Sequence, residues 1–425
     1  MATDQPRRPA GSPSGGQRDE VTCAGPEPSR APGPAWPTHG AETIEWHSAD
    51  ARPGPRTSRS QRTGPYEASI PPGIADAALD LPSPTIALVT EASAEMARFD
   101  GETLGSTMSY AALLLRTEAA SSSQIENLTS SAKAIALAEL GRKGRANADE
   151  IVANVTAMTE ALELAKHLDA DAILRMHRTL MSPHTPSAAG VWRTEQVWIG
   201  GSATSPHGAT YVAPVHERVP AAIDDLVAFI RRDDLPVLAQ AALTHAQFES
   251  IHPFTDGNGR TGRALLHAQL RNGGLARQSI VPVSAGLLVD TDRYFDALIA
   301  YRDGDVDLIV AEVAGAVFPA LANSRQLITD VRTARAAWDD RIRARRGAAA
   351  WGLADLLITR PVVDTRLVAD QLGVAAVNAQ LAIDRLVEDG VLEQIGRGAR
   401  DRVWQAVEVL DAMERFASRS HRRVW

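Results

Sequence analysis

Apolar residues recur every three to four positions over most of the chain, which is the spacing of one face of an α-helix. From residue 65 onward this pattern predicts a succession of helices with few interruptions. These helices are expected over residues 85–99, 109–140, 147–167, 169–181, 214–231, 236–250, 259–272, 293–304 and 307–345. The protein is therefore expected to be mainly α-helical.

Two stretches, 197–201 and 209–212, break the helical pattern. Both are rich in β-prone residues, and Gly, Ser and Pro connect them, which predicts a two-stranded hairpin on the helical body. Beyond residue 350 the pattern gives a helix ending near Gly373, a second helix over 377–389 and a further hairpin. That order is typical of a winged helix-turn-helix.

These patterns divide the chain into five segments. Residues 1–64 are rich in Pro, Gly, Ser and Arg without periodicity, so we expect a disordered tail. An N-terminal helical segment (65–145) and the main helical core (146–325) follow. A connecting helix (326–349) then leads to the winged helix-turn-helix (350–425).

Composition narrows the class of protein. A net charge of −8 in 425 residues and a pI of about 5.8 argue against a globally basic nucleic-acid-binding protein. The single cysteine, Cys23, excludes an intrachain disulfide and a cysteine-based zinc site. No apolar leader and no stretch resembling a membrane span is evident, so we expect a cytoplasmic protein.

The residues that point to chemistry gather in one loop between two predicted helices. Gly257 and Gly259 allow backbone N–H groups to converge there, and the next helix begins with its positive dipole end at the same place. Arg260 and Arg263 are three apart on that helix, so both reach toward one side. The loop is therefore a predicted anion site, and His252 beside it is a candidate catalytic residue.

Two other interpretations of the loop fit its residues less well. The glycine spacing from Gly257 to Gly262 matches the dinucleotide-binding fingerprint, but a helix precedes it, and the apolar residues 281–283 stand where an acidic residue is expected. His252 and Asp256 have the spacing of a metal-ligand pair, but the loop between them breaks the required helix geometry.

The stretch from His252 to Arg263 resembles the signature of Fic domains, His-Pro-Phe-x-Asp/Glu-Gly-Asn-Gly-Arg-x-x-Arg, at every specified position. Most members of that family transfer AMP from ATP to Ser, Thr or Tyr hydroxyls of proteins. The resemblance implies that His252 deprotonates the target hydroxyl and that Asp256 holds Mg²⁺ or Mn²⁺. It also implies a set of residues that bind the ATP phosphates: Gly257, Asn258, Gly259, Arg260 and Arg263.

An upstream stretch resembles the inhibitory motif of the same family, Ser/Thr-x-x-x-Glu-Gly/Asn. Ser122, Glu126 and Asn127 occupy its key positions. The resemblance implies that Glu126 pairs with Arg263 and so denies that arginine to the γ-phosphate. The alternative is a plain helix end, because asparagine tolerates the left-handed conformation found there.

Further positions resemble other parts of the Fic fold. Trp198, Tyr211 and Val212 of the predicted hairpin resemble the flap that holds an extended target segment by main-chain pairing. Tyr294 and Tyr301 are seven apart on one helical face and resemble positions near the adenine. The alternative for all of the aromatic residues is ordinary core packing.

The predicted activity is protein adenylyl transfer, with ATP as substrate and either a target protein or the chain itself as acceptor. Two alternatives stay open: removal of AMP at the same site, and a DNA-binding regulator built on a Fic core. The second helix of the winged unit is net acidic, which disfavours DNA, although Arg397, Arg400 and Arg402 could touch a phosphate backbone. A homodimer is a further open possibility, and no membrane partner is expected.

Overall fold

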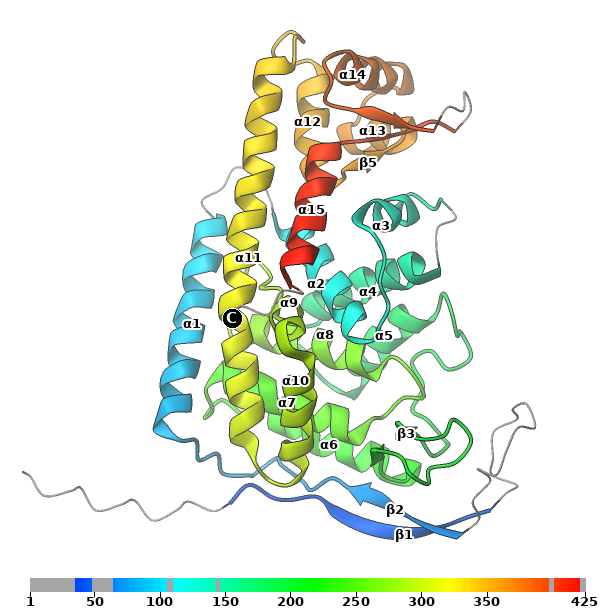
Figure 1. The fold of residues 1–425 in the computed structure, drawn as a ribbon, viewed down its shortest axis with the longest axis vertical. Helices are drawn as coiled ribbons and strands as arrows, with labels where there is room; N and C mark the ends of the chain where they lie inside the picture. Colours follow the sequence, from blue (N-terminus) through cyan, green and yellow to red (C-terminus); the bar gives the residue numbers. More distant parts are fainter. Residues whose placement is uncertain (1–34, 48–63, 105–109, 143–145, 397–400, 421–425) are drawn as a thin grey trace, which may run out of the picture. The chain divides into compact units, whose positions relative to one another are not determined.

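Helices dominate the structure, a computed structural model that describes residues 35–47, 64–104, 110–142, 146–396 and 401–420 (Figure 1). The core helices are α1 (Ser83–Leu104), α2 (Ala111–Ile125), α3 (Ala132–Glu139), α4 (Ala146–Glu163), α5 (Ala170–Met181), α6 (Val219–Ile230), α7 (Val237–Ile251), α8 (Asn258–Asn272), α9 (Val283–Leu287), α10 (Thr291–Arg302) and α11 (Val306–Arg341). The prediction of a mainly helical protein is confirmed.

The helix α7 lies at the centre of the core. Every residue from Leu238 to Ile251 is buried. A helix that is surrounded on all sides loses the polar stripe of a surface helix, which explains why this segment is apolar around most of its circumference. Its C-terminal end, and with it the loop that follows, is therefore held rigidly by the neighbouring helices α6, α8 and α11.

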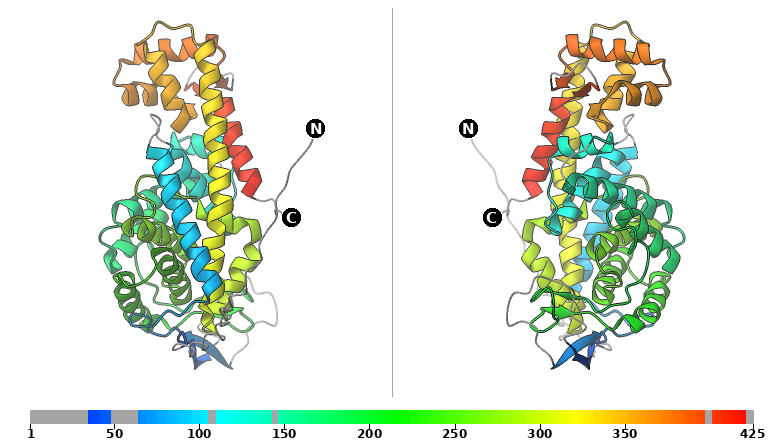
Figure 2. Two further views of the ribbon diagram at one scale, coloured as in Figure 1. Left: turned by 90° about the vertical axis from the view of Figure 1, so that its left-hand side faces the viewer. Right: turned by 90° about the vertical axis from the view of Figure 1, so that its right-hand side faces the viewer.

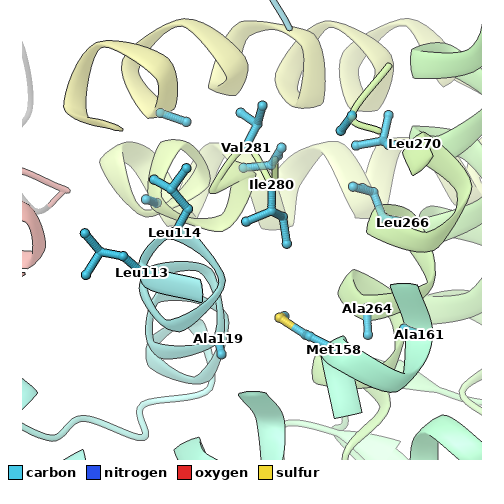
Figure 3. Packing of buried hydrophobic residues seen from close by; sticks show 14 of the residues in the cluster. Leu113, Leu114, Ala119, Met158, Ala161, Ala264, Leu266, Leu270, Ile280 and Val281 are labelled. Atoms are coloured by element: carbon cyan, nitrogen blue, oxygen red, sulfur yellow. The ribbon is translucent and has the colours of Figure 1, made fainter. Parts of the chain in front are cut away.

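The helix α2 packs against both α4 and α8. Figure 3 shows Ala119 of α2 on the side of Met158 of α4, and Leu114 of α2 toward Ile280 and Val281, all within one apolar cluster. Because α2 leads into the predicted inhibitory motif and α8 begins at the predicted phosphate loop, this packing fixes the two motifs relative to each other.

The predicted helix over 109–140 is wrong as a single element. The structure ends α2 at Ile125 and begins α3 at Ala132. Asn127 has a left-handed backbone (φ 61°), which a helix does not continue through, and the Ser131 hydroxyl caps α3 by accepting from the Ala134 N–H (3.2 Å). The predicted motif therefore spans the end of α2 and the turn that follows it.

The predicted disordered tail is wrong for residues 35–47. There the strand β1 (Gly40–Trp46) pairs antiparallel with β2 (Gly64–Ile70). The chain is ordered because Trp36 and Trp46 are buried, the first against Phe229 and the second against neighbouring aromatic rings. Residues 1–34 and 48–63, which share the same prediction, lie outside the described residues.

The predicted flap hairpin is confirmed. It consists of the short antiparallel strands β3 (Trp198–Ile199) and β4 (Tyr211–Val212). Strand β2 lies against β4, so the N-terminal hairpin supports the flap. Figure 1 shows both hairpins at the same end of the core.

The C-terminal unit has its elements in the predicted order. They are α12 (Ala349–Thr359), β5 (Val362–Val363), α13 (Thr365–Leu372), α14 (Ala376–Glu388), β6 (Glu393–Ile395) and β7 (Val403–Gln405). The three strands form an antiparallel sheet in the order β5-β7-β6, and Gly373 ends α13 with φ 62°.

The helix expected over 307–345 is α11, which is continuous through the boundary drawn at 325/326. One expectation about the C-terminal half needs correction, because the segment 350–425 contains a further helix, α15 (Val407–Ser420), after the winged-helix elements. Figure 2 shows α15 running beside α11. It is amphipathic and buries Val409, Met413 and Phe416 against the core.

Among the residues that the structure describes, α11 alone has the length and apolar composition that could cross a membrane. More than half of its most apolar stretch is buried inside the protein, as in the central helix of a soluble core. By length and composition, α11 departs from the expectation that no stretch of the chain resembles a membrane span.

Candidate active site

The helices α7 and α8 meet at the loop that carries the predicted chemistry. His252 ends α7 with a left-handed backbone (φ 48°, ψ 59°), and Gly257 precedes α8 with φ 75°. The Asn258 side chain closes the loop, because its Oδ1 accepts from the Phe254 N–H and its Nδ2 donates to the Phe254 carbonyl, both at 2.9 Å. The structure therefore has the predicted loop between two helices.

His177 of α5 supports this loop from beneath. Its ring stacks on Phe254 with centroids 3.5 Å apart. The Gly190 N–H donates to Nδ1 (2.9 Å), so Nε2 carries the hydrogen and donates to the Asp256 carbonyl (3.0 Å). Sequence reasoning assigned His177 no role, because a histidine on the buried face of a helix is by itself typical of a core position.

His252 is half-buried and lines the cavity beside the loop. Its carbonyl accepts from Arg193 Nε (2.8 Å), and its Nδ1 lies 3.3 Å from the Glu249 carbonyl. Since a carbonyl only accepts, Nδ1 carries the hydrogen in this contact and Nε2 is left as the acceptor. Burial, with Arg193 and Arg302 nearby, lowers the pKa of His252 to about 4, so the imidazole is neutral at neutral pH.

The cavity has a volume of about 950 Å³, and the N-terminal end of α8 forms one wall. The structure brings every predicted residue of the loop to its lining: His252, Asp256, Gly257, Asn258, Gly259, Arg260 and Arg263. The helix N-terminus and the two buried guanidinium groups of Arg260 and Arg263 are groups that bind phosphate.

Arg260 is almost fully buried at this wall. Its Nη1 lies 3.4 Å from Glu150 Oε2 on α4, and its Nη2 lies 3.7 Å from Asp256 Oδ1. Glu150 also lines the cavity and was not predicted, because only tertiary packing brings α4 to the loop. These two carboxylates hold the guanidinium at the cavity.

Arg263 makes the predicted ion pair with the motif at the end of α2. Its Nη2 donates to Glu126 Oε1 (3.0 Å) and to the Ser122 carbonyl (2.8 Å), and its Nε donates to Ser122 Oγ (2.8 Å). Asn127 provides the left-handed residue that turns the chain away after Glu126. Both interpretations of this motif, helix end and partner of Arg263, describe the structure.

Glu249 is a further carboxyl group of the cavity that sequence reasoning did not identify. It is nine-tenths buried on α7, and its Oε1 has no hydrogen-bond partner among the described residues. Burial raises the pKa of Glu249 to about 7, in spite of the nearby Arg263.

The three predicted flap residues, Trp198, Tyr211 and Val212, all lie near the site, but they differ in how far they are buried. Trp198 lines the cavity and also a smaller one of about 320 Å³ that it shares with His252 and Thr255. Tyr211 is buried, donates its hydroxyl to the Ser250 carbonyl and lies under the Arg302 guanidinium. Tyr211 is therefore a packing residue in this structure, while Trp198 and the half-buried Val212 are beside it on the two strands.

The two tyrosines predicted near the adenine separate in the structure. Tyr294 lines the cavity and its hydroxyl bonds to His245 (2.6 Å). Tyr301 is not brought to the site: it is buried against Trp36 and donates to Gln247 Oε1 (2.9 Å). Next to Tyr294, the cavity is lined by three apolar side chains from the neighbouring part of the chain, Leu288, Phe295 and Leu298.

The site combines a neutral histidine with a helix N-terminus that can bind an anion, and a short hairpin lies beside both. This combination is typical of enzymes that transfer a phosphate-containing group. Residues 167–270 match the Fic/DOC family, and residues 86–163 match the N-terminal region of the Fic/DOC family. The chain therefore contains a Fic/DOC domain preceded by the N-terminal region of that family, and the resemblance read from the sequence is confirmed.

Curated relatives include protein adenylyltransferase fic-1 of Caenorhabditis elegans, 33% identical over 147 residues, which are 34% of this chain and 26% of the relative. Protein adenylyltransferase Fic of Drosophila willistoni is 30% identical over 142 residues, which are 33% of this chain and 26% of the relative. The match thus spans about a quarter of the length of these relatives.

Similar solved structures include a Fic family protein from Desulfovibrio desulfuricans G20, at 20% identity and a TM-score of 0.49, covering 77% of this chain and 97% of that one. Fic-1 from Caenorhabditis elegans is similar at 22% identity and a TM-score of 0.45, covering 59% of this chain and 75% of that one.

Proposed function

We propose that this chain is a protein adenylyltransferase that moves AMP from ATP to a hydroxyl group of a target protein or of itself. The observation that carries the proposal is the shared cavity in which the neutral imidazole of His252 faces the N-terminal end of α8 and two buried arginines. Transfer at phosphorus requires a base, a fixed phosphate chain and charge neutralisation, and these residues supply all three. The curated relatives are named protein adenylyltransferases.

In the proposed reaction the target hydroxyl oxygen attacks the α-phosphorus of ATP. A new P–O bond forms, the bond from the α-phosphorus to the pyrophosphate oxygen breaks, and pyrophosphate leaves. Nε2 of His252 takes the hydroxyl proton. The backbone N–H groups of Gly257 to Gly259 and the Arg260 guanidinium hold the phosphates during this step.

A divalent metal fits the site only together with the nucleotide. Within the described ranges, no group of three or more His, Cys, Asp or Glu side chains is placed to hold a metal ion. Mg²⁺ in nucleotide sites takes one or two carboxylates plus phosphate oxygens, and Asp256, 67% exposed at the cavity, suits that role. When bound, the ion neutralises phosphate charge.

The target segment is proposed to lie along the flap. In the part of the chain that the structure describes, β3 pairs with β4 and its other edge carries no strand. An extended segment added to that edge is held by main-chain hydrogen bonds, and the cavity shared by Trp198 and His252 receives its hydroxyl side chain.

Glu126 is proposed to inhibit the transfer. Its carboxylate occupies Arg263 and lies against Gly259, at the position where the end of the phosphate chain has to bind. Removing the carboxylate leaves the loop intact and frees the guanidinium, so the Glu126→Gly variant is expected to be more active than wild type.

The DNA-binding alternative receives no support from α14. Its exposed face carries Val377 (72% exposed), Leu381 (62% exposed) and the acidic Asp384 and Glu388, which do not suit a phosphate backbone. In the following hairpin Arg402 lies over Trp404, and Arg397 and Arg400 lie outside the described residues.

The test is incubation of wild type, Glu126→Gly and Glu126→Gly/His252→Ala with α-³²P-ATP or γ-³²P-ATP and Mg²⁺, followed by gel autoradiography and intact mass. Glu91→Gly, on the exposed face of α1, is the matched control. We expect strong α-label in Glu126→Gly alone and no γ-label.

Label from γ-³²P-ATP would indicate phosphoryl transfer, and no label in any variant would remove ATP-dependent transfer from consideration. Removal of AMP is distinguished by incubating labelled Glu126→Gly protein with wild type. If label is lost only when Glu126 is present in the added protein, the site works in the reverse direction.

A further inference from the structure

The inhibitory motif lies in the middle of two helices and the turn between them, residues 111–139, which we call the α2–α3 segment. Both helices contact the C-terminal region, by which we mean α12 to α15. The helix α2 contacts α12 and α15, and α3 contacts β5 and α15 (Figure 1). All of these elements belong to one compact unit, residues 35–425. The C-terminal region therefore supports the segment that carries Glu126.

Glu139, the last residue of α3, is shared by two arginines. Its Oε1 lies 2.5 Å from Arg116 Nε on α2, and its Oε2 lies 3.0 Å from Arg360 Nη1, directly after α12. Arg116 also donates to the carbonyl of Thr359, the last residue of α12. Hydrogen bonds between charged groups are stronger than those between neutral groups. One carboxylate, 9% exposed, thus joins α2 and α3 to α12.

The contact of Glu139 with Arg360 is accessible from outside the core. Arg116, Glu139 and Arg360 line a cavity of about 930 Å³, which shares no lining residue with the active-site cavity. The Arg116 side chain is 6% exposed, whereas that of Arg360 is 40% exposed. Water therefore reaches the arginine of the C-terminal region, and this contact can open while Arg116 stays paired.

Glu414 of α15 holds the other end of α3, where the inhibitory turn ends. Its Oε1 accepts from the N–H of Ala132, the first residue of α3 (2.6 Å). The first N–H groups of a helix have no partner within the helix, and a carboxylate there is favoured by the helix dipole. Just beyond α3, Arg142 Nη2 lies 3.3 Å from Asp364 Oδ2. The C-terminal region thus contacts both ends of α3.

The ion pair of Glu126 is not sufficient to hold the inhibitory turn by itself. The Glu126 side chain is 41% exposed, and its Oε1 lies 3.0 Å from Arg263 Nη2. Ion pairs at such partly exposed positions contribute little stability on their own. The position of Glu126 therefore depends on how firmly the backbone on both sides of the turn is held, by α2 before it and by α3 after it.

We propose that the C-terminal region regulates the transfer by holding the α2–α3 segment, through Arg360 and Glu414, in the position in which Glu126 pairs with Arg263. When these contacts open, the turn shifts, Glu126 leaves Arg263, and the guanidinium becomes available to the nucleotide. The inference rests on the proposed adenylyl transfer and on its inhibition by Glu126. Arg360 and Glu414 are positioning residues, since they act through the α2–α3 segment.

The first arm of the test measures α-³²P incorporation by full-length Arg360→Ala and Glu414→Ala, each with Glu126 present and in the Glu126→Gly background. With Glu126 present, we expect the rate to rise roughly threefold or more over wild type, because each variant loses a hydrogen bond that holds the segment. In the Glu126→Gly background we expect no change, because no inhibitory carboxylate is left. Arg366→Ala on α13 (91% exposed) and Asp411→Ala on α15 are the exposed controls, with no change expected in either background.

The comparison of the two backgrounds distinguishes release of inhibition from a general loss of stability. A variant that merely unfolds loses activity in both backgrounds, so it cannot produce a rise that depends on Glu126. Two variants at different contacts are used, so that poor folding of one does not prevent the test.

The second arm measures amide hydrogen exchange of residues 122–132 by mass spectrometry, in the full chain and without ATP. Exchange reports local opening of the backbone. We expect faster exchange in Arg360→Ala and Glu414→Ala than in wild type, and wild-type exchange in the two exposed controls.

The two arms separate failure of the proposed function from failure of the regulation. If Glu126→Gly incorporates no AMP, adenylyl transfer fails, and the exchange measurement alone decides whether the C-terminal region holds the inhibitory motif. The regulation is overturned if neither variant raises the rate while Glu126→Gly does, or if exchange of residues 122–132 is unchanged. A rise of equal size in the Glu126→Gly background, or in the exposed controls, would also overturn it.

Discussion

A methyl group added to Gly259 would lie 1.9 Å from Glu126 Oε1 and 3.0 Å from Arg263 Nη1. The missing side chain at Gly259 is therefore what lets the carboxylate of Glu126 approach the arginine. At the scale of single residues, the proposed inhibition is a competition for the buried guanidinium of Arg263, between the carboxylate of Glu126 and a phosphate of the nucleotide.

Ser122 is expected to contribute to that competition, because its hydroxyl and carbonyl orient Arg263. Ser122→Ala removes one hydrogen bond, worth about 1 kcal/mol, so AMP incorporation should rise about threefold to tenfold over wild type, less than in Glu126→Gly. The measurement is the initial rate of α-³²P incorporation.

The control for this prediction is Ser123→Ala on the same helix. The Ser123 hydroxyl donates to the Ala119 carbonyl and does not contact Arg263. Equal rates for the two alanine variants would contradict a specific role of Ser122.

At the scale of secondary-structure elements, the C-terminal ends of two helices position His252 and Glu126. The helix α7 stops at His252 and α2 stops before Asn127, and both residues have left-handed backbones. A residue with a left-handed backbone ends the helix and turns the chain sharply, so it fixes the direction in which the adjacent side chains point. Two helix ends thus define the base and the proposed inhibitory group.

Asn127 offers a test at this scale. Valine is strained in a left-handed backbone by roughly 1–2 kcal/mol and glycine is not, so Asn127→Val should loosen the turn, move Glu126 and raise AMP incorporation. Asn127→Gly should remain close to wild type. Identical rates for the two variants, with unchanged circular dichroism, would show that the turn does not position Glu126.

Over the whole molecule, buried histidines couple protonation to stability. Burial is the largest cause that lowers the pKa of His39, His177 and His252 to about 4 and that of His245 to about 3, against an ordinary value of 6.5. Between these values the unfolded chain binds more protons, so stability falls as pH decreases from about 6.5 to about 4. Glu249, with its pKa raised to about 7, and Glu312, whose pKa burial also raises, act in the opposite direction but are two groups against four.

The melting temperature should therefore fall by roughly 5 °C or more between pH 7 and pH 5, as measured by scanning calorimetry. His39→Gln, which removes one of the four groups at a distance from the loop, should reduce this dependence. A melting temperature that stays constant or increases toward pH 5 would contradict the burial of these imidazoles.

The sequence predicted the helices from their apolar spacing, the flap hairpin, and the loop from His252 to Arg263, because periodicity and glycine content are local properties. It also predicted the contact of Glu126 with Arg263, through resemblance to a motif. It missed the strand β1, whose order depends on a partner strand and on distant aromatic rings, and the helix α15, which is stabilised by α11.

The amino-acid sequence alone identifies the residues that carry the chemistry: a histidine, two glycines whose backbone N–H groups converge, and arginines on one helical face. All other features of the site depend on how the helices pack. The tertiary structure separates Tyr301 from Tyr294, brings Glu150 and Glu249 to the cavity, and places His177 under the loop. These contacts join residues far apart in the chain, so no local pattern encodes them, and only packing of the helices brings them together.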